Sequence, residues 1–170
     1  MTGRRQLEDA ARWAASFRLE EAPTDVVDLS TWQVANILAA ILAGSRSAVG
    51  EKAWRAARRT MQQGPCAVLP HGDKVSLFDA LYLHVVFANA LELDDFHYRG
   101  HLGQAAVVVP LAMAQCGGGD GATVLRAQIV ANELAGRLGW AITAEIRHGH
   151  QRSYLLRFGA AAAAGVFLGL

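Results

Sequence analysis

The sequence predicts an all-α domain with at most one short β-hairpin. Apolar residues recur three to four positions apart in almost every segment, which is the spacing of one face of a helix. Helix-capping and helix-breaking residues separate these segments, and only CAVL, residues 66–69, has the character of a short strand. With 170 residues and no repeat or low-complexity linker, the chain is expected to form one domain over residues 1–170.

The N-terminal part is predicted to form three helices. Residues 4–19 carry apolar side chains at helical spacing and end at the breaker EEAPTD. Thr24 or Asp25 is expected to cap a second helix, which is apolar over most of its length and ends at AGS, residues 43–45. A third helix, at about 48–62, has a basic side that we interpret as a solvated face: Lys52, Arg55, Arg58 and Arg59.

The central part combines the short strand with a core helix. HGDK follows CAVL as a turn, and a capping box of Ser76 with Asp79 opens a helix at about 77–91. Because this helix is apolar nearly all round, we expect it in the core. The next segment, 104–116, contains Pro110, where we expect a helix to start or to kink.

The last part is predicted to be helical after the flexible loop CGGGDG. A helix at 123–138 places Glu133 and Arg137 as an i,i+4 ion pair, and helical spacing continues through 140–146. A helix of small residues, 158–170, ends the sequence.

Composition limits the partners. Hydrophobic residues make up 52% of the chain and charged residues only 18%, so we expect association with another chain to cover apolar surface. The net charge is +1 and no block of Lys and Arg is interleaved with aromatics, which argues against nucleic acid. The uncharged run 158–170 is shorter than the ~20 residues of a spanning helix, so no membrane partner is expected.

Cysteine usage and the N-terminus favour a cytoplasmic location. Cys66 and Cys116 lie far apart, and no CxxC motif or cysteine framework is present, so a reducing compartment fits. The N-terminal MTGRRQLEDAARW has no apolar stretch of the kind that a secretory signal needs.

One stretch, ALELDDFHYRGHLGQAAVVVP, concentrates acids and imidazoles beside an apolar segment: Glu92, Asp94, Asp95, His97 and His101. From the residues alone, a metal site, an acid/base site and a polar loop are all open. Asp94 and Asp95 at a helix C-terminus favour hydrogen bonds that shape the loop, and His97 is expected to be exposed. The spacing matches no HExxH-like ligand pattern, so we predict no metal.

Four segments carry motifs that occur together elsewhere. They are VANILAAILAGS (34–45), NALELDD (89–95), VANELAGRLG (130–139) and GHQRSYLLRFGAAAAAGVFLGL (149–170). In this order they resemble D-T-L-G-x-x-L-A-G, H-A-L-D-F-D-D, A-G-Y-E-x-A-x-R-L-G and F-H-P-T-G-T-A-G-x-F-G-A-A-A-A-A-x-x-L-G-L of the MmgE/PrpD family. The resemblance covers nearly the whole of this chain, but it extends only over the first helical part of the family's proteins.

The resemblance implies a helical domain with a site at its edge. In the family the active site lies between a helical domain and an α/β lid domain, and groups are added or lost beside a carboxylate. We therefore expect the lid domain to be absent here and no cofactor to be required. The register implies Glu92, His101 and His150 as catalytic residues, while Phe96 stands where the family has Thr.

These residue types suit proton transfer beside a carboxylate. Glu92, expected to be buried at the end of an apolar helix, would be the general base, and His101 and His150 would carry the other protons. Arg152 would pair with a substrate carboxylate and Tyr154 would donate to an oxyanion. The predicted substrate-binding residues are Asp94, Asp95, Phe96, Arg152 and Tyr154.

Two functions stay open. The first is a lyase, isomerase or cyclase that acts on an organic acid or biosynthetic intermediate of bacterial metabolism. The second is a non-catalytic binding or scaffold subunit, or one half of a split enzyme whose partner chain carries the lid. The retained Glu92, His101 and His150 favour the first, whereas Phe96 and the altered QRSYLL favour the second.

A homo-oligomer, most simply a dimer, is predicted from the C-terminal helix 158–170. Its glycines and alanines allow close packing on another helix. Its larger apolar side chains would face water unless a second subunit covers them: Val166, Phe167, Leu168 and Leu170.

Overall fold

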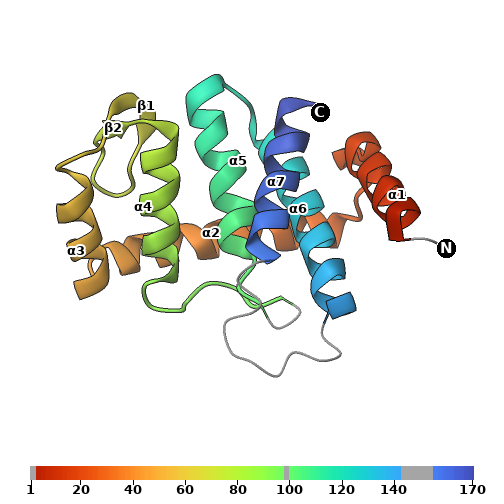
Figure 1. The fold of residues 1–170 in the computed structure, drawn as a ribbon, viewed down its shortest axis with the longest axis horizontal. Helices are drawn as coiled ribbons and strands as arrows, with labels where there is room; N and C mark the ends of the chain where they lie inside the picture. The colour runs from red at the N-terminus through yellow and green to blue at the C-terminus, as the bar shows by residue number, and fades with distance from the viewer. Residues whose placement is uncertain (1–2, 98–99, 143–154) are drawn as a thin grey trace.

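The computed structural model describes residues 3–97, 100–142 and 155–170 and confirms the all-α prediction (Figure 1). Within these ranges lie seven α-helices, one 3₁₀ turn and one two-stranded antiparallel sheet. The elements are α1 (Gly3–Ser16), η1 (Leu19–Glu21), α2 (Thr24–Ser45), α3 (Ala48–Ala57), β1 (Gln63–Ala67), β2 (Lys74–Val75), α4 (Leu77–Asn89), α5 (Gly103–Gly117), α6 (Gly121–Ile142) and α7 (Leu155–Leu168).

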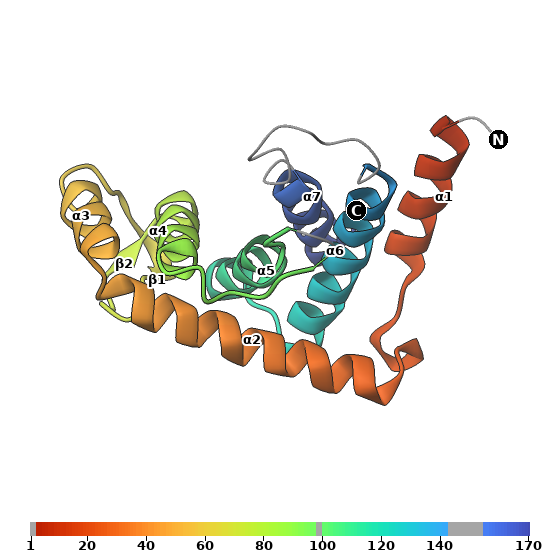
Figure 2. The same cartoon turned by 90° about the horizontal axis from the view of Figure 1, so that it is seen from below.

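Helix α2 runs along one edge of the molecule, and the helices that pack on it all lie on the same side (Figure 2). Its inner side buries Ile37, Ala40 and Ile41 against α4 and α5. Gly44 lies where α2 meets the end of α4, and a Cβ there would overlap the carbonyl oxygen of Phe87. The close approach of these two helices therefore requires glycine.

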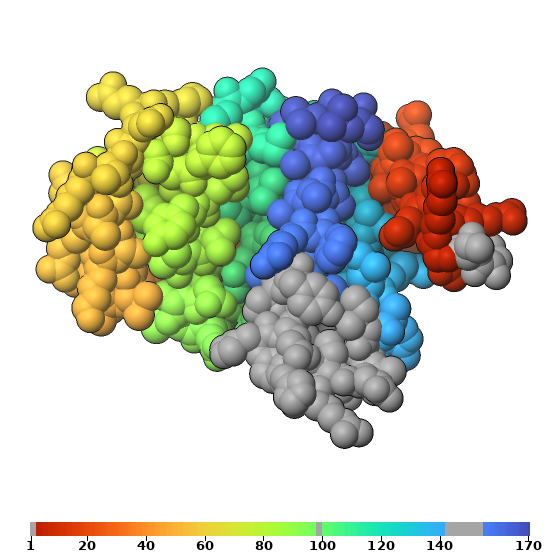
Figure 3. All heavy atoms as spheres, viewed as in Figure 1, coloured from red at the N-terminus to blue at the C-terminus, as the bar shows by residue number. Residues whose placement is uncertain are grey.

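Helices α5, α6 and α7 form the second half of the core, and α4, α5 and α7 lie side by side on one face (Figure 3). Their contact uses small residues, with Ala106, Ala131 and Ala163 forming one buried cluster. Gly159 of α7 lies against Ala135 of α6, so the glycine and alanine run packs within one chain.

The final helix therefore does not depend on a second subunit in the way that its sequence suggested. Val166 is buried and Phe167 is partly buried against α6 and the end of α1. Only Leu168 and Leu170 of the four large side chains are exposed. The homo-oligomer stays a prediction, with Leu168 and Leu170 as the large apolar side chains of this helix tail that a second subunit would cover.

Two hydrogen bonds hold α1 to the rest of the molecule. Arg126 of α6 donates from Nε to the carbonyl oxygen of Phe17 (2.8 Å) and from Nη2 to that of Ala15 (3.0 Å). Both carbonyls lie at the C-terminal end of α1, where helix carbonyls have no partner within the helix.

Several predicted boundaries shift in the structure. The third helix ends at Ala57 rather than near 62, because the chain turns into β1. Helix α5 begins at Gly103 and continues through Pro110, which is accommodated inside the helix rather than starting it. The Ser76 cap of α4 is confirmed, since its side chain accepts from the backbone N–H of Asp79 (3.2 Å).

The hairpin of β1 and β2 packs on α4 and α5. His84 of α4 is buried, and its Nε2 accepts the backbone N–H of Leu69 (2.8 Å). Cys66 of β1 and Cys116 of α5 form a disulfide. The sequence had predicted a reducing compartment, in which disulfides are rare. Their separation in sequence gave no sign of the pairing, because only the packing of β1 against α5 brings them together.

Helix α2 is also long and apolar enough, by length and composition, to cross a membrane. It is longer than the C-terminal run 158–170, from which no membrane partner was expected. One side of α2 is packed on α4, α5 and α6, as in the core helix of a soluble protein, which passes the same test.

Candidate functional site

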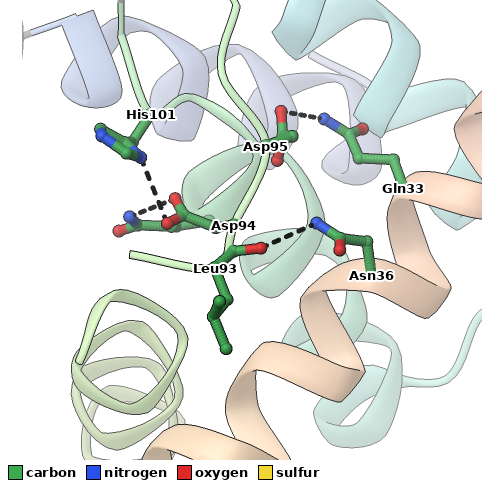
Figure 4. Close-up of polar contacts among 7 residues, drawn as sticks. Gln33, Asn36, Leu93, Asp94, Asp95 and His101 are labelled. Carbon is green, nitrogen blue, oxygen red and sulfur yellow. Dashed lines mark hydrogen bonds and ion pairs between the residues drawn. The ribbon is translucent and has the colours of Figure 1, made fainter. Parts of the chain in front are cut away.

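The loop that follows α4 passes between α2 and the start of α5 and carries the predicted site residues. Asn36 of α2 holds it by donating from Nδ2 to the carbonyl oxygen of Leu93 (3.5 Å) (Figure 4). Glu92 has φ +51°, which is the left-handed region that non-glycine residues seldom adopt. The loop therefore turns sharply just before the acidic pair Asp94 and Asp95.

Asp94 and His101 form the most organised polar contact of this loop. The Asp94 side chain has no solvent exposure, and its Oδ1 lies 3.2 Å from Nδ1 of His101. Its Oδ2 accepts a 2.6 Å hydrogen bond from Nε2 of Gln104, in the first turn of α5. Both carboxylate oxygens thus have partners, as a buried carboxylate requires.

This arrangement fixes the orientation of the His101 ring. An ionised Asp94 accepts the Nδ1–H, so the imidazole presents Nε2 as its available proton acceptor. The His101 side chain keeps 33% exposure, so the ring is partly open to solvent. Phe96 packs edge-on against the ring, with centroids 5.1 Å apart, and restricts its movement.

Asp95 has a different role from Asp94. Its Oδ2 accepts from Nε2 of Gln33 (2.8 Å), while Oδ1 is buried against Gly103 without a hydrogen-bond partner in the described part of the chain. A Cβ at position 103 would overlap this carboxylate, so glycine lets the acid approach the N-terminus of α5. The positive end of that helix favours a carboxylate there.

Gln33 links three segments through its amide. Its Oε1 accepts from Asn132 Nδ2 (2.7 Å) and from Gln128 Nε2 (2.6 Å), while its Nε2 holds Asp95. Helices α2 and α6 and the acidic loop are therefore tied together by a partly buried amide network. Its hydrogen bonds fix the position of Gln33, while Oε1 of Gln128 is buried without a hydrogen-bond partner in the described part of the chain.

A groove of about 530 Å³ opens beside this network, between α2, the loop and α6. Gln33, Asn36 and Asn132 give it a polar side, and its rim is apolar. Its lining residues are Val26, Leu29, Ser30, Trp32, Gln33, Asn36, Asp95, Phe96, His97, Ile129, Asn132 and Glu133. Asp95 and Phe96 therefore face this groove, whereas Glu92, Asp94 and His101 are not among its lining residues.

His97 is partly buried in this groove, although its position at the loop edge predicted exposure. Burial lowers the pKa of its imidazole, and the charges of Asp95 and Glu133 offset part of that effect. Its neutral form is therefore favoured at pH 7.

Glu92 does not match the environment predicted for it. The sequence placed it in a buried position where desolvation would raise its proton affinity, but its side chain is exposed because the chain has already left the core at this point. The buried carboxylate of the site is Asp94. His150, Arg152 and Tyr154 lie outside the described residues, so their convergence with Glu92 and His101 stays a prediction.

The described part of the chain contains no group of three His, Cys, Asp or Glu side chains that could hold a metal ion. Of the three residues considered for a metal, Asp94 and His101 contact each other, while His97 lines the groove. Sequence reasoning missed Gln33, Gln104 and Asn132. Only Gln104 had a visible signal, as a polar residue opening an otherwise apolar segment.

The chain is similar in sequence to known proteins over most of its length. The family model of the MmgE/PrpD N-terminal domain matches residues 8–170. Cis-aconitate decarboxylase of Aspergillus terreus is 28% identical over 141 residues, which are 79% of this chain and 29% of that protein. The cis-aconitate decarboxylase-like protein oryM of Aspergillus oryzae is 28% identical over 106 residues, 62% of this chain and 22% of that protein. The chain thus spans less than a third of these relatives' length, and no solved structure matches it.

Proposed function

Since the chain belongs to the MmgE/PrpD family through its N-terminal domain, we propose that it works in a lyase-type enzyme that transfers protons beside a carboxylate of a small organic acid. Two relatives that carry the name cis-aconitate decarboxylase support a substrate of this class. The chain covers 29% of these proteins, so the reaction, the substrate and a cytoplasmic location all belong to the proposal.

The observation that carries the proposal is the contact of His101 with the buried Asp94. A carboxylate on Nδ1 orients the imidazole and stabilises its protonated form, which is the arrangement that a general base needs. Gln104 in turn holds the second oxygen of Asp94. Asp94 acts through His101 and is a positioning residue, rather than the substrate-binding residue that the sequence suggested.

The proposed step is a proton transfer at carbon. In an elimination, Nε2 of His101 takes the proton from the carbon beside a carboxylate while the bond to the leaving group breaks. In a decarboxylation, CO₂ leaves with cleavage of its C–C bond, the double bond of the resulting allylic carbanion shifts, and the imidazolium gives its proton to the former vinyl carbon. Both reactions use the protonated form of the ring, whose positive charge the ionised Asp94 stabilises.

The other predicted residues take secondary parts in this proposal. Glu92 is exposed at the turn before Asp94 and is a second proton carrier. Phe96 presents an exposed ring, so its contribution to binding is apolar contact, and Asp95 holds the loop against α5.

The test is turnover of cis-aconitate by the 170-residue chain, followed by NMR as loss of the vinyl proton signal. His101→Gln is expected to lower turnover on the order of 10²-fold or more, since it removes the proton acceptor. Asp94→Asn is expected to lower kcat more than it raises KM and to change the pH profile. Asp9→Asn, at an exposed acid of α1, is the matched control and should leave turnover unchanged.

A second measurement keeps the proposal open to refutation if the chain shows no turnover. The NMR signals of the His101 ring should shift when cis-aconitate is added to the chain at millimolar concentration. The same signals should shift less in the Asp94→Asn variant. If neither turnover nor the His101 signal responds to di- and tricarboxylates, the proposal fails.

A binding or scaffold subunit, or one half of a split enzyme, is the second candidate. Phe96 favours it, because an exposed ring cannot donate the hydrogen bond of the Thr that the resemblance placed there. A neighbouring gene that encodes the remaining part of the family's sequence would support the split enzyme.

A further inference from the structure

The disulfide of Cys66 and Cys116 joins the β-hairpin to the last turn of α5, at the end of that helix opposite the loop that carries His101 (Figure 1). The two Cα atoms are 5.5 Å apart, a separation that a disulfide spans without movement of the backbone. The two residues are 50 positions apart in sequence, so the bond closes a long loop of chain. The fold thus holds two sulfurs where a bond between them can form and break.

The two sulfurs differ in their access to solvent. Cys66 has no exposure, whereas Cys116 is only partly buried. The glycines that follow Cys116 are exposed, and a Cβ at Gly117 or Gly118 would meet nothing within 4 Å among the described residues. A dissolved thiol or disulfide can therefore approach the sulfur of Cys116 but not that of Cys66. Access of this kind decides which sulfur takes part first in thiol–disulfide exchange.

The position of the hairpin does not depend on the bond. Ala67 of β1 donates its backbone N–H to Oε1 of Gln115 (3.0 Å), and the backbone N–H of Leu69 donates to His84 (2.8 Å). Val68 is buried in the core cluster that also contains residues of α4 and α5. None of these contacts uses sulfur. We therefore expect the reduced chain to keep the same architecture.

The reduced form of Cys66 also fits its surroundings. Its sulfur lies 3.4 Å from the carbonyl oxygen of Ala112, which can accept a hydrogen bond from a thiol. A free cysteine is among the residues that proteins bury most readily, because it packs as a small apolar side chain. The same packing thus accommodates both redox states, as a reversible pair requires.

We propose that Cys66 and Cys116 are a reversible thiol–disulfide pair, in which Cys116 exchanges with small-molecule thiols and disulfides and the bond fixes the hairpin to α5. The Cys116 thiolate attacks a small disulfide such as oxidised glutathione, forms a mixed disulfide and releases one glutathione thiolate. The Cys66 thiolate then attacks the Cys116 sulfur, which closes the internal bond and releases the second glutathione thiolate. Each released thiolate takes up a proton that a cysteine has lost, so two protein thiols are oxidised and one small disulfide is reduced.

A permanent structural bond is the alternative. Structural disulfides are typical of small secreted domains whose cores are too small to hold the fold. This chain has 170 residues, and its hairpin packs directly on α4 and α5. The exposure of Cys116 leaves the bond open to attack, which favours the reversible pair. Neither cysteine lies in the loop that carries His101 or lines the groove, so the pair can be tested independently of the proposed function.

The first test is exchange in the folded 170-residue chain. The chain is incubated without denaturant in mixtures of reduced and oxidised glutathione, free thiols are trapped by alkylation, and the intact mass is measured. The wild-type chain should pass between dithiol and internal disulfide in both directions while its circular dichroism stays that of the folded chain. A bond that is reduced only after denaturant is added would overturn the proposal.

Two matched variants identify the sulfur that reacts first. Cys66→Ser should gain one glutathionyl group, because Cys116 is accessible and no second sulfur can displace glutathione. Cys116→Ser should gain it on the order of tenfold more slowly or not at all, since Cys66 is buried. Equal uptake by the two variants would overturn the assignment. If a variant fails to fold, alkylation of the reduced wild-type chain gives the same comparison, with Cys116 expected to react about tenfold faster or more.

The effect of the bond on the hairpin is tested by thermal unfolding. The Tm of the oxidised wild-type chain should exceed that of the reduced chain by roughly 5–15 °C, because the bond restricts a long loop of the unfolded chain. Cys116→Ser should unfold near the temperature of the reduced wild-type chain and should not respond to oxidised glutathione. The same Tm for both redox states of the wild-type chain would show that the bond does not fix the hairpin.

Discussion

At the scale of single residues, the acids of the site are alike in type but differ in burial and in the partners of their oxygens. Asp94 and Asp95 are adjacent acids, yet Asp94 orients His101 and Asp95 rests on Gly103 at the start of α5. Glu92, with its left-handed backbone, turns the chain just before this pair. A residue's place in this loop therefore decides its chemistry.

Glu92→Gly tests the cost of that turn. A non-glycine residue in the left-handed region costs about 1–2 kcal/mol, which glycine removes. The greater flexibility of glycine in the unfolded chain offsets part of this stabilisation. We expect the free energy of unfolding to stay equal or rise by up to about 1 kcal/mol, measured by urea denaturation. A fall of more than about 1 kcal/mol would mean that the Glu92 side chain supports the fold.

At the scale of elements, small residues set how closely helices approach. Gly44 allows α2 to meet the end of α4, and alanines bring α5, α6 and α7 together. Neither contact gains much hydrophobic energy per residue, but both let the larger neighbours pack without voids.

Gly44→Ala is expected to be strongly destabilising, by roughly 3 kcal/mol or more, because the backbone of α4 must move to make room for a methyl group. Gly165→Ala is the matched control in α7, where a Cβ meets nothing within 4 Å. There alanine should stabilise by about 0.5–1 kcal/mol through its helix propensity. Thermal unfolding that gave both variants the same sign of effect would contradict this account of the packing.

At the scale of the whole molecule, buried polar groups make stability depend on pH. Burial lowers the pKa of His84 from 6.5 to about 4, and its Nε2 accepts a backbone N–H, which requires the neutral ring. The unfolded chain takes up a proton near pH 6.5, but the folded chain does so only near pH 4.

The stability that His84 contributes is thus fully present above pH 6.5 and is lost as the pH falls towards 4. The loss amounts to up to about 3 kcal/mol. His84→Gln keeps an acceptor for Leu69 and cannot titrate, so its free energy of unfolding should vary less between these pH values. Equal pH dependence in the variant and the wild type would assign the effect to another group.

The sequence by itself determined the features that depend on neighbours along the chain. The helical class, the Ser76 cap and the Glu133–Arg137 ion pair were all predicted, because periodicity, capping and i,i+4 contacts are local. The family resemblance was confirmed, since it rests on the order of motifs along the chain. That residues 1–170 form one domain stays a prediction.

Only the tertiary structure decided which faces are covered and which side chains meet. Glu92 proved exposed and Asp94 buried, because the path of the loop between α2 and α5 sets their burial. Gln33 reaches Asp95 across 62 positions and Cys66 reaches Cys116 across 50, contacts that no local pattern encodes. Helix α2 is apolar over most of its surface, so its sequence could not show which side packs inside. Its outer face became visible only once α4, α5 and α6 occupied the other side.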